Sequence, residues 1–336
     1  MPSALIRRPL TITAWVVASV LLLAFSPVLL GVAAVIGAIT GRPLPTILAR
    51  LLISYCAYEL GTLIACGLLW VLALGGLMIE RPRIQALHWA LVRSCARAAA
   101  RRCRRLLSID VTREDSGAAV AALRSERPLL MLSRHAGPGD TVLLLDALMS
   151  EWDRRPSIVF KRALVIDPCI DLVAHRLPQA IVDAGDEAGA ARRIEQLAGS
   201  LRPRGIIVLF PEGGNFSVER RRRAIRRLTR KGHRAAAARA RQMRHVVAPH
   251  PSGVRAALAG NPDLPVVFAA HTGLGLAAQP GELWREPPLG RTLRTRMWLV
   301  TPQEVPSAEA ELAEWLNDWW ARIDRWIDAQ QTEVEC

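Results

Sequence analysis

The first eighty residues are dominated by two long apolar runs. Residues 9–41 carry no charged side chain, and arginines flank the run at positions 7, 8 and 42. A helix that crosses a bilayer needs about 20 apolar residues, so this run predicts a membrane span, with a kink at Pro27. A cleavable signal peptide is the alternative interpretation, but its apolar core is usually only about 7–15 residues long.

A second apolar run covers residues 51–79 and contains one charged residue, Glu59. Residues 60–79 alone are long enough to cross a bilayer, which places Glu59 at the interface; a buried, paired acid is the other interpretation. Positive charge gathers on the cytoplasmic side of membranes, and arginines lie at both outer ends of the runs. We therefore predict a hairpin of two transmembrane helices with both ends in the cytoplasm, and a single re-entrant element is the alternative.

Residues 84–107 place apolar side chains at helical spacing beside an arginine-rich face. Such a helix either lies on an anionic lipid surface or is a solvated helix of the domain that follows, and we favour the first interpretation. The chain is therefore expected to have a membrane anchor at residues 1–82, a basic interfacial helix and linker at 83–117, and a folded domain at 118–336.

From about residue 118, short apolar runs alternate with helical segments. This alternation predicts an α/β fold with a mostly parallel central sheet and flanking helices. The predicted strands are residues 128–133, 157–160, 180–184, 205–210, 245–249, 265–270 and 295–300, and the clearest helices are 141–152 and 187–201. Near the C-terminus, Leu and Trp recur at helical spacing over residues 308–330, which predicts a helix that packs on the core or sits in a membrane interface.

Composition narrows the possible partners. The 336 residues are 51% hydrophobic, which excludes a long disordered protein. The formal net charge of +14 favours an anionic partner, namely nucleic acid, an acidic membrane surface or a phosphorylated substrate. The six cysteines form neither a CxxC pair nor a zinc spacing, so we expect a reducing compartment and no metal.

The predicted strand 128–133 is followed by a glycine-containing loop that holds His135 and Asp140. A neutral histidine can take a proton from an alcohol, and a carboxylate on its other nitrogen fixes the tautomer and stabilises the imidazolium. Glycines allow the loop to turn, so that the acid can reach the ring. Histidine and aspartate at this spacing are common by chance, but a position between a strand end and a helix start favours a site.

A second loop of this kind follows the predicted strand 205–210. It holds Glu212 and then two glycines, Gly213 and Gly214. Consecutive glycines expose backbone N–H groups that can face an anion or a polyol, so all three residues are candidates for substrate binding. The alternative is that Glu212 is a loop carboxylate satisfied by local N–H groups.

Together, His-x4-Asp and the Phe-Pro-Glu-Gly of residues 210–213 resemble the motifs of the glycerolipid acyltransferase family, which includes the 1-acylglycerol-3-phosphate acyltransferases. The resemblance covers roughly residues 120–275. It implies that His135 and Asp140 are the catalytic pair.

Two weaker blocks agree with this resemblance. Residues 160–164, with Lys161, are similar to an intermediate block whose basic residue helps to engage substrate, and residues 247–249 are similar to a final block that contains proline.

The resemblance implies transfer of an acyl group from acyl-CoA, or from an acyl carrier protein, to a glycerol hydroxyl. His135 would deprotonate the hydroxyl, Asp140 would orient His135, and backbone N–H groups would stabilise the oxyanion. Neither a cofactor nor a metal is expected. A nucleophilic Ser133 is the competing mechanism, but the sequence around it lacks the Gly-x-Ser-x-Gly elbow.

One departure from the family pattern concerns the substrate headgroup. The family's Thr-Arg-Ser is replaced by residues 214–216, so the usual phosphate-binding arginine is missing, as in relatives similar to lysocardiolipin acyltransferases. Residues 219–244 then carry 12 basic side chains and one acid, a run that is either solvated or collects phosphate and anionic lipid. We favour the second interpretation, with Arg220 to Arg223 as the candidates to replace the missing arginine, and Arg220 and Arg221 as the expected substrate-binding residues.

The expected protein is thus a membrane acyltransferase that acylates a lysophospholipid, with 1-acyl-sn-glycerol-3-phosphate as the preferred acceptor and phosphatidic acid as the product. Its catalytic domain is expected on the cytoplasmic side of the cell membrane. A different headgroup is one alternative, and a serine hydrolase is another. A non-catalytic anchor for nucleic acid is disfavoured because residues 218–244 contain no aromatic side chain to stack on bases.

Overall fold

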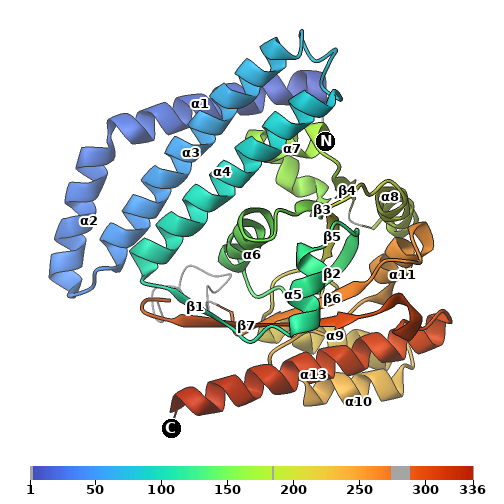
Figure 1. Ribbon diagram of the computed structural model, residues 1–336. Coiled ribbons are helices and arrows are strands. Elements are labelled where there is room, and N and C mark those ends of the chain that lie inside the picture. Colours follow the sequence, from blue (N-terminus) through green and yellow to red (C-terminus); the bar gives the residue numbers. More distant parts are fainter. Residues whose placement is uncertain (1–2, 184, 274–287, 336) are drawn as a thin grey trace. The chain divides into compact units, whose positions relative to one another are not determined.

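The computed structural model describes residues 3–183, 185–273 and 288–335 (Figure 1). The chain divides into two compact units. The first consists of Met1–Ile109 and Phe160–Ala184, and the second of Asp110–Val159 and Gly185–Cys336. The predicted domain boundaries at residues 82 and 117 stay predictions.

The first unit is mainly helical. Its elements are α1 (Ala4–Ala24), α2 (Ser26–Thr40), α3 (Leu44–Leu72), α4 (Pro82–Leu107), the short 3-10 helix η1 (Arg162–Ile166), α7 (Pro168–Arg176) and β4 (Ala180–Val182).

The first predicted span consists of two helices rather than one. The chain leaves the helix at Phe25 and restarts at Ser26 with a proline in the first turn of α2, where the missing N–H of proline costs nothing. The second span, α3, begins at Leu44 rather than at residue 51 and ends at Leu72 rather than at residue 79. Both α1 and α2 pack against α3 (Figure 1), as the predicted hairpin requires.

Among the described residues, two helices, α1 with 21 residues and α3 with 29 residues, are long and apolar enough to cross a membrane. This property is weakly consistent with a membrane anchor, because a core helix or a signal sequence has it too. The basic helix α4 packs along α3 (Figure 1), with the Tyr58 hydroxyl donating to the Ala98 carbonyl at 3.4 Å and Arg102 Nε donating to Ser54 Oγ at 2.8 Å.

A buried carboxylate ties α1 to α7 within this unit. The side chain of Asp171 is fully buried. It accepts hydrogen bonds from Arg7 Nη2 at 2.7 Å and Arg8 Nε at 2.9 Å, and His175 Nδ1 lies 3.0 Å from it. A buried charge is tolerated only when it is paired and hydrogen-bonded in this way, so Asp171 fixes the start of α1.

The second unit is an α/β structure. Its helices are α5 (Gly117–Arg124), α6 (Pro138–Ser150), α8 (Glu187–Gly199), α9 (Val218–Arg230), α10 (Arg234–Gln242), α11 (Pro251–Gly260), the 3-10 helix η2 (Pro302–Glu304) and α13 (Glu309–Glu335). Its strands are β1 (Asp110–Arg113), β2 (Leu129–Ser133), β3 (Arg155–Lys161, of which residues 155–159 belong here), β5 (Gly205–Leu209), β6 (Val266–His271) and β7 (Thr292–Val300).

The strands of this unit form one mostly parallel sheet in the order β1-β7-β6-β2-β5-β3. The central strand β2 is parallel to both β5 and β6, with Leu130 opposite Ile207 and Val266, and β7 runs antiparallel to β6. The predicted fold class is therefore confirmed. Because β2 and β5 are parallel neighbours, the loops that follow them emerge at the same edge of the sheet.

Side chains of β6 alternate between two faces, as the period of a strand requires. Val267 and Ala269 belong to the core cluster that includes residues of α5 and α6, whereas the ring of Phe268 stacks on Trp319 of α13 with a centroid distance of 4.3 Å. The side chain of Trp320 is fully buried. The apolar stripe of α13 thus packs on the core, which was the first of the two interpretations of this stripe.

One predicted strand does not form, and one strand of the sheet, β1, was not predicted. Residues 245–249 are not a strand, because neighbouring backbone N–H groups bond to side chains instead of to a sheet. Arg244 and His245 donate to Asp324, at 3.0 and 2.6 Å, and Val247 donates to Glu212 at 2.9 Å. The basic run before this segment forms α9 and α10.

The Asp171 network predicts a specific weakness in the first unit. Asp171→Asn leaves buried Arg7 without its ionic partner, which typically costs about 3–5 kcal/mol. Amide hydrogens of α1 and α7 should then exchange about 100-fold faster or more, as measured by mass spectrometry on the full chain in detergent.

The matched control is Asp153→Asn, which removes a carboxylate that is 50% exposed and pairs with Arg204. Exposed pairs contribute about 0–1 kcal/mol, so this variant should exchange almost as the wild type does. If the amide hydrogens of α1 and α7 exchanged at the same rate in the wild type and in Asp171→Asn, the network would not hold α1 in place.

Candidate active site

His135 lies two residues beyond the end of β2, in the loop that leads into α6. Three contacts join it to the loop after β5. Its imidazole stacks on Phe210 with a centroid distance of 4.4 Å, its backbone N–H donates to Glu212 Oε1 at 3.2 Å, and its carbonyl accepts from the Phe216 N–H at 2.7 Å. The two sequence motifs therefore form one site, although they lie about seventy residues apart in the chain.

Glu212 is the buried centre of this loop. Its side chain is 1% exposed, and its second oxygen accepts the Val247 N–H at 2.9 Å. Burial raises the pKa of Glu212 to about 7, although the nearby Arg134 guanidinium acts in the opposite direction. Glu212 is thus a buried acceptor of backbone N–H groups, but these groups come from distant segments and not from the local backbone that the alternative interpretation invoked.

Asp140 lies in the first turn of α6 and is buried. The predicted contact between its carboxylate and the His135 imidazole stays a prediction. The structure also brings a second histidine near the acid, because His271 Nδ1 lies 3.9 Å from Asp140 Oδ2.

Sequence reasoning missed two buried residues of this site, Arg134 and His271. The Arg134 guanidinium donates to the His271 carbonyl at 2.8 Å and to the His245 carbonyl at 2.9 and 3.1 Å. His271 Nε2 donates to the Arg134 carbonyl at 3.0 Å, and burial lowers the pKa of its imidazole. A local indication was available only for Arg134, a charged residue directly after an apolar strand.

The two glycines after Glu212 adopt backbone conformations, and leave space, that other residues would not allow. Gly213 has a left-handed φ of +71° and Gly214 has a φ of +154°. A Cβ on Gly214 would lie 2.6 Å from Arg220 Nη1, so a side chain there would collide with the guanidinium. The glycine allows Arg220 to approach the loop, where its Nη2 donates to the Glu212 carbonyl at 3.2 Å.

The other predicted ligands are placed differently. Arg221 donates to the carbonyls of Arg241, at 2.7 Å, and Met243, so its guanidinium holds the end of α10. Lys161 belongs to the first unit, and its predicted role stays a prediction. Ser133 is 1% exposed, and its hydroxyl donates to the Arg134 carbonyl at 3.0 Å.

A pocket of about 830 Å³ lies beside the Phe-Pro-Glu-Gly loop. Six arginines line it, together with Glu212, His250 and a few small or apolar side chains; the arginines are Arg220, Arg223, Arg226, Arg227, Arg230 and Arg241. His250 Nε2 accepts a hydrogen bond from Arg227 Nη2 at 2.6 Å. Burial and the neighbouring Arg227 lower the pKa of His250 to about 4, so its ring is neutral at pH 7.

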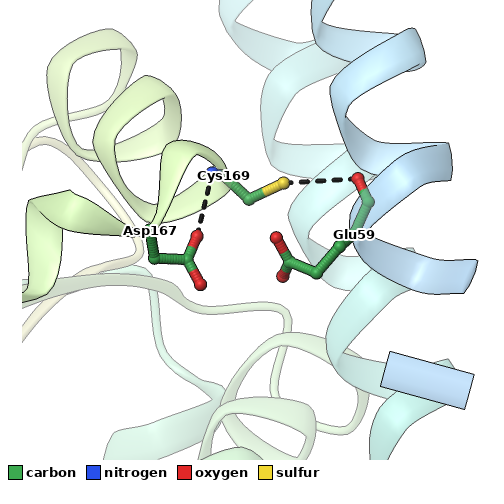
Figure 2. A group of neighbouring side chains, drawn as sticks. All are labelled: Glu59, Asp167 and Cys169. Carbon is green, nitrogen blue, oxygen red and sulfur yellow. Dashed lines mark hydrogen bonds between the residues drawn. The ribbon is translucent and has the colours of Figure 1, made fainter. Parts of the chain in front are cut away.

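One group of side chains in the first unit offers ligand atoms for a metal ion. Figure 2 shows Glu59, Asp167 and Cys169, whose oxygen and sulfur atoms lie within 4.8 Å of one another. Asp167 caps α7 by accepting the N–H groups of Cys169 and Ile170 at 2.9 and 3.0 Å. Burial raises the pKa of the Cys169 thiol, which disfavours the thiolate that metals bind.

Comparison with known proteins agrees with the motifs. Residues 113–269 match the family model described as Acyltransferase. The match contains both motif loops and the central strands of the sheet, so residues 113–269 are an acyltransferase domain. None of the curated proteins compared with the chain matches it.

Glu212 predicts an unusual dependence of stability on pH. Its pKa of about 7 in the folded protein lies above the ordinary value near 4.3, so folding takes up a proton between these values. Its contribution to stability therefore falls as pH rises from about 4 to about 7 and is constant above that. The difference in unfolding free energy between the wild type and Glu212→Gln should change by about 3 kcal/mol over this range, as measured by urea denaturation in detergent.

The amide in Glu212→Gln can accept only one of the two N–H groups, so the backbone of His135 should also shift and acyl transfer should fall by about tenfold or more. Glu219→Gln, at an exposed carboxylate of α9, is the control for loss of one charge and should retain activity. A pH-independent stability difference for Glu212→Gln would exclude a raised pKa at this carboxylate.

Proposed function

We propose that this protein is a membrane-associated acyltransferase that moves a fatty acyl group from acyl-CoA to the free glycerol hydroxyl of a lysophospholipid. The observation that carries the proposal is the contact of the Phe-Pro-Glu-Gly loop with His135, through the Phe210 ring and the Glu212 carboxylate. The acyltransferase domain supports the reaction class, and the preferred acceptor we propose is 1-acyl-sn-glycerol-3-phosphate.

The proposed reaction is a direct attack on the thioester. His135 takes the proton of the acceptor hydroxyl while the oxygen attacks the carbonyl carbon. The tetrahedral intermediate then expels the CoA thiolate as the carbon–sulfur bond breaks, and the thiolate receives the proton from the His135 imidazolium. Asp140 is assigned the stabilisation of that imidazolium, and no acyl-enzyme intermediate forms.

Binding of the acceptor phosphate is assigned to Arg220. Arg220 lies over Gly214 and donates to the Glu212 carbonyl. The carboxylate of the same Glu212 accepts the His135 N–H, so one residue links the Arg220 guanidinium to His135. An arginine binds phosphate by paired hydrogen bonds, and Arg220 is therefore proposed to take the place of the missing family arginine. The apolar helices α1 and α3 are proposed to hold the enzyme at the membrane, where its lipid substrates lie.

The general-base role of His135 is testable by substitution. His135→Ala should lower kcat for transfer from radiolabelled acyl-CoA to lysophosphatidate by about 10²–10⁴, the usual contribution of such a base. Purified protein in mixed micelles is the appropriate sample, with folding checked by circular dichroism. Activity within tenfold of the wild type would remove His135 from the reaction.

Ser133→Ala is the matched control, because Ser133 is the nucleophile of the competing mechanism and lies two residues away. The direct mechanism predicts that this variant keeps its activity within about tenfold. Loss of activity in Ser133→Ala, together with labelling of the wild type by a fluorophosphonate probe, would instead establish a covalent serine mechanism.

A further inference from the structure

The pocket beside Glu212 holds more positive charge than one acceptor phosphate can neutralise. Six arginines line it, and in the described part of the chain none of the six pairs with a carboxylate. A phosphomonoester carries about −1.5 to −2 charges at pH 7. With Arg220 assigned to the acceptor phosphate, five arginines of the pocket are left without a charge partner.

These arginines form a surface directed into the pocket. Arg223, Arg226, Arg227 and Arg230 lie at helical positions i, i+3, i+4 and i+7 of α9, which share one helix face. Arg241 joins them from α10, where its Nη2 donates to Thr229 Oγ1 at 3.3 Å. Arg222 of the same helix does not line the pocket.

One contact fixes part of this surface before any ligand binds. The neutral ring of His250 accepts a hydrogen bond from Arg227 at 2.6 Å, so it orients the guanidinium without reducing its charge. The pocket also has an apolar part, formed by Ala224, Ile225 and Val247. Its volume of about 830 Å³ lies in the range of about 300–1,000 Å³ typical of small-molecule sites.

The nucleotide end of CoA matches this combination. Its pyrophosphate and its 3′-phosphate together carry about four negative charges, its adenine can cover apolar side chains, and guanidinium groups bind phosphate oxygens in pairs. Glu212 places this pocket next to the reaction, since its carbonyl contacts Arg220 and its carboxylate contacts the backbone of His135.

We infer that the arginine face of α9, with Arg241 of α10, binds the 3′-phosphate and the pyrophosphate of the CoA donor. This inference rests on the proposed function for the identity of the donor. The basic run then has three separate roles, because Arg220 binds the acceptor, the arginine face binds the donor, and Arg221 holds the backbone of α10.

The test measures binding and kinetics separately on the full chain in detergent. The double variant Arg226→Gln/Arg230→Gln should weaken the Kd for CoA and for adenosine 3′,5′-bisphosphate by about tenfold or more in calorimetry, since hydrogen bonds to charged groups are strong. It should raise the KM for acyl-CoA to a similar extent, with kcat and the KM for lysophosphatidate unchanged. Wild-type protein should bind dephospho-CoA about tenfold more weakly than CoA.

The control is Arg222→Gln/Arg234→Gln, which removes the same charge from exposed positions of α9 and α10 outside the pocket and should bind CoA as the wild type does. Equal losses in both double variants would indicate general electrostatic attraction and overturn the inference. A rise in the KM for lysophosphatidate alone would assign the pocket to the acceptor and overturn it as well. CoA binding without any acyl transfer would contradict the proposed function but leave the binding site intact.

Discussion

The candidate site depends on one buried carboxylate. Glu212 accepts N–H groups from His135 and Val247, one with each oxygen, and so joins three segments that are distant in the chain. An unpaired buried N–H or carboxylate would cost several kcal/mol. Separating these segments would break the hydrogen bonds of both the carboxylate and the N–H groups, so the segments stay together. The catalytic histidine of the proposed reaction is positioned through its backbone by this interaction, and its ring is positioned by the stack on Phe210.

Burial also shifts the pKa values of two titratable side chains of the site. Glu212 has a pKa raised to about 7, and burial lowers the pKa of His271. The Arg134 guanidinium donates to carbonyl oxygens, and its charge opposes the rise in the pKa of Glu212. Hydrogen bonds thus link Glu212, Arg134 and His271 to the backbone around His135, which restricts the movement of this segment.

The two units present different surfaces to their surroundings. Exposed apolar side chains cover α1 and α2 in the first unit, whereas the second unit gathers arginines around a pocket next to its reactive loop. Apolar surface of this kind suits lipid tails, and unpaired guanidinium groups suit phosphates. The proposed reaction, which joins an acyl chain to a phospholipid precursor, needs both types of surface.

Local patterns in the sequence determined much of this protein: the apolar helices, most strands of the parallel sheet, the C-terminal helix and the two motif loops. They failed for residues 245–249, because the N–H groups there bond to Glu212 and Asp324, which are remote in sequence. Only the tertiary structure revealed that Arg220 and Arg221 serve different partners and that Arg134 and His271 belong to the site. The physical reason is that periodicity reports which face of an element is buried, whereas hydrogen-bond partners and pockets arise when distant segments pack together.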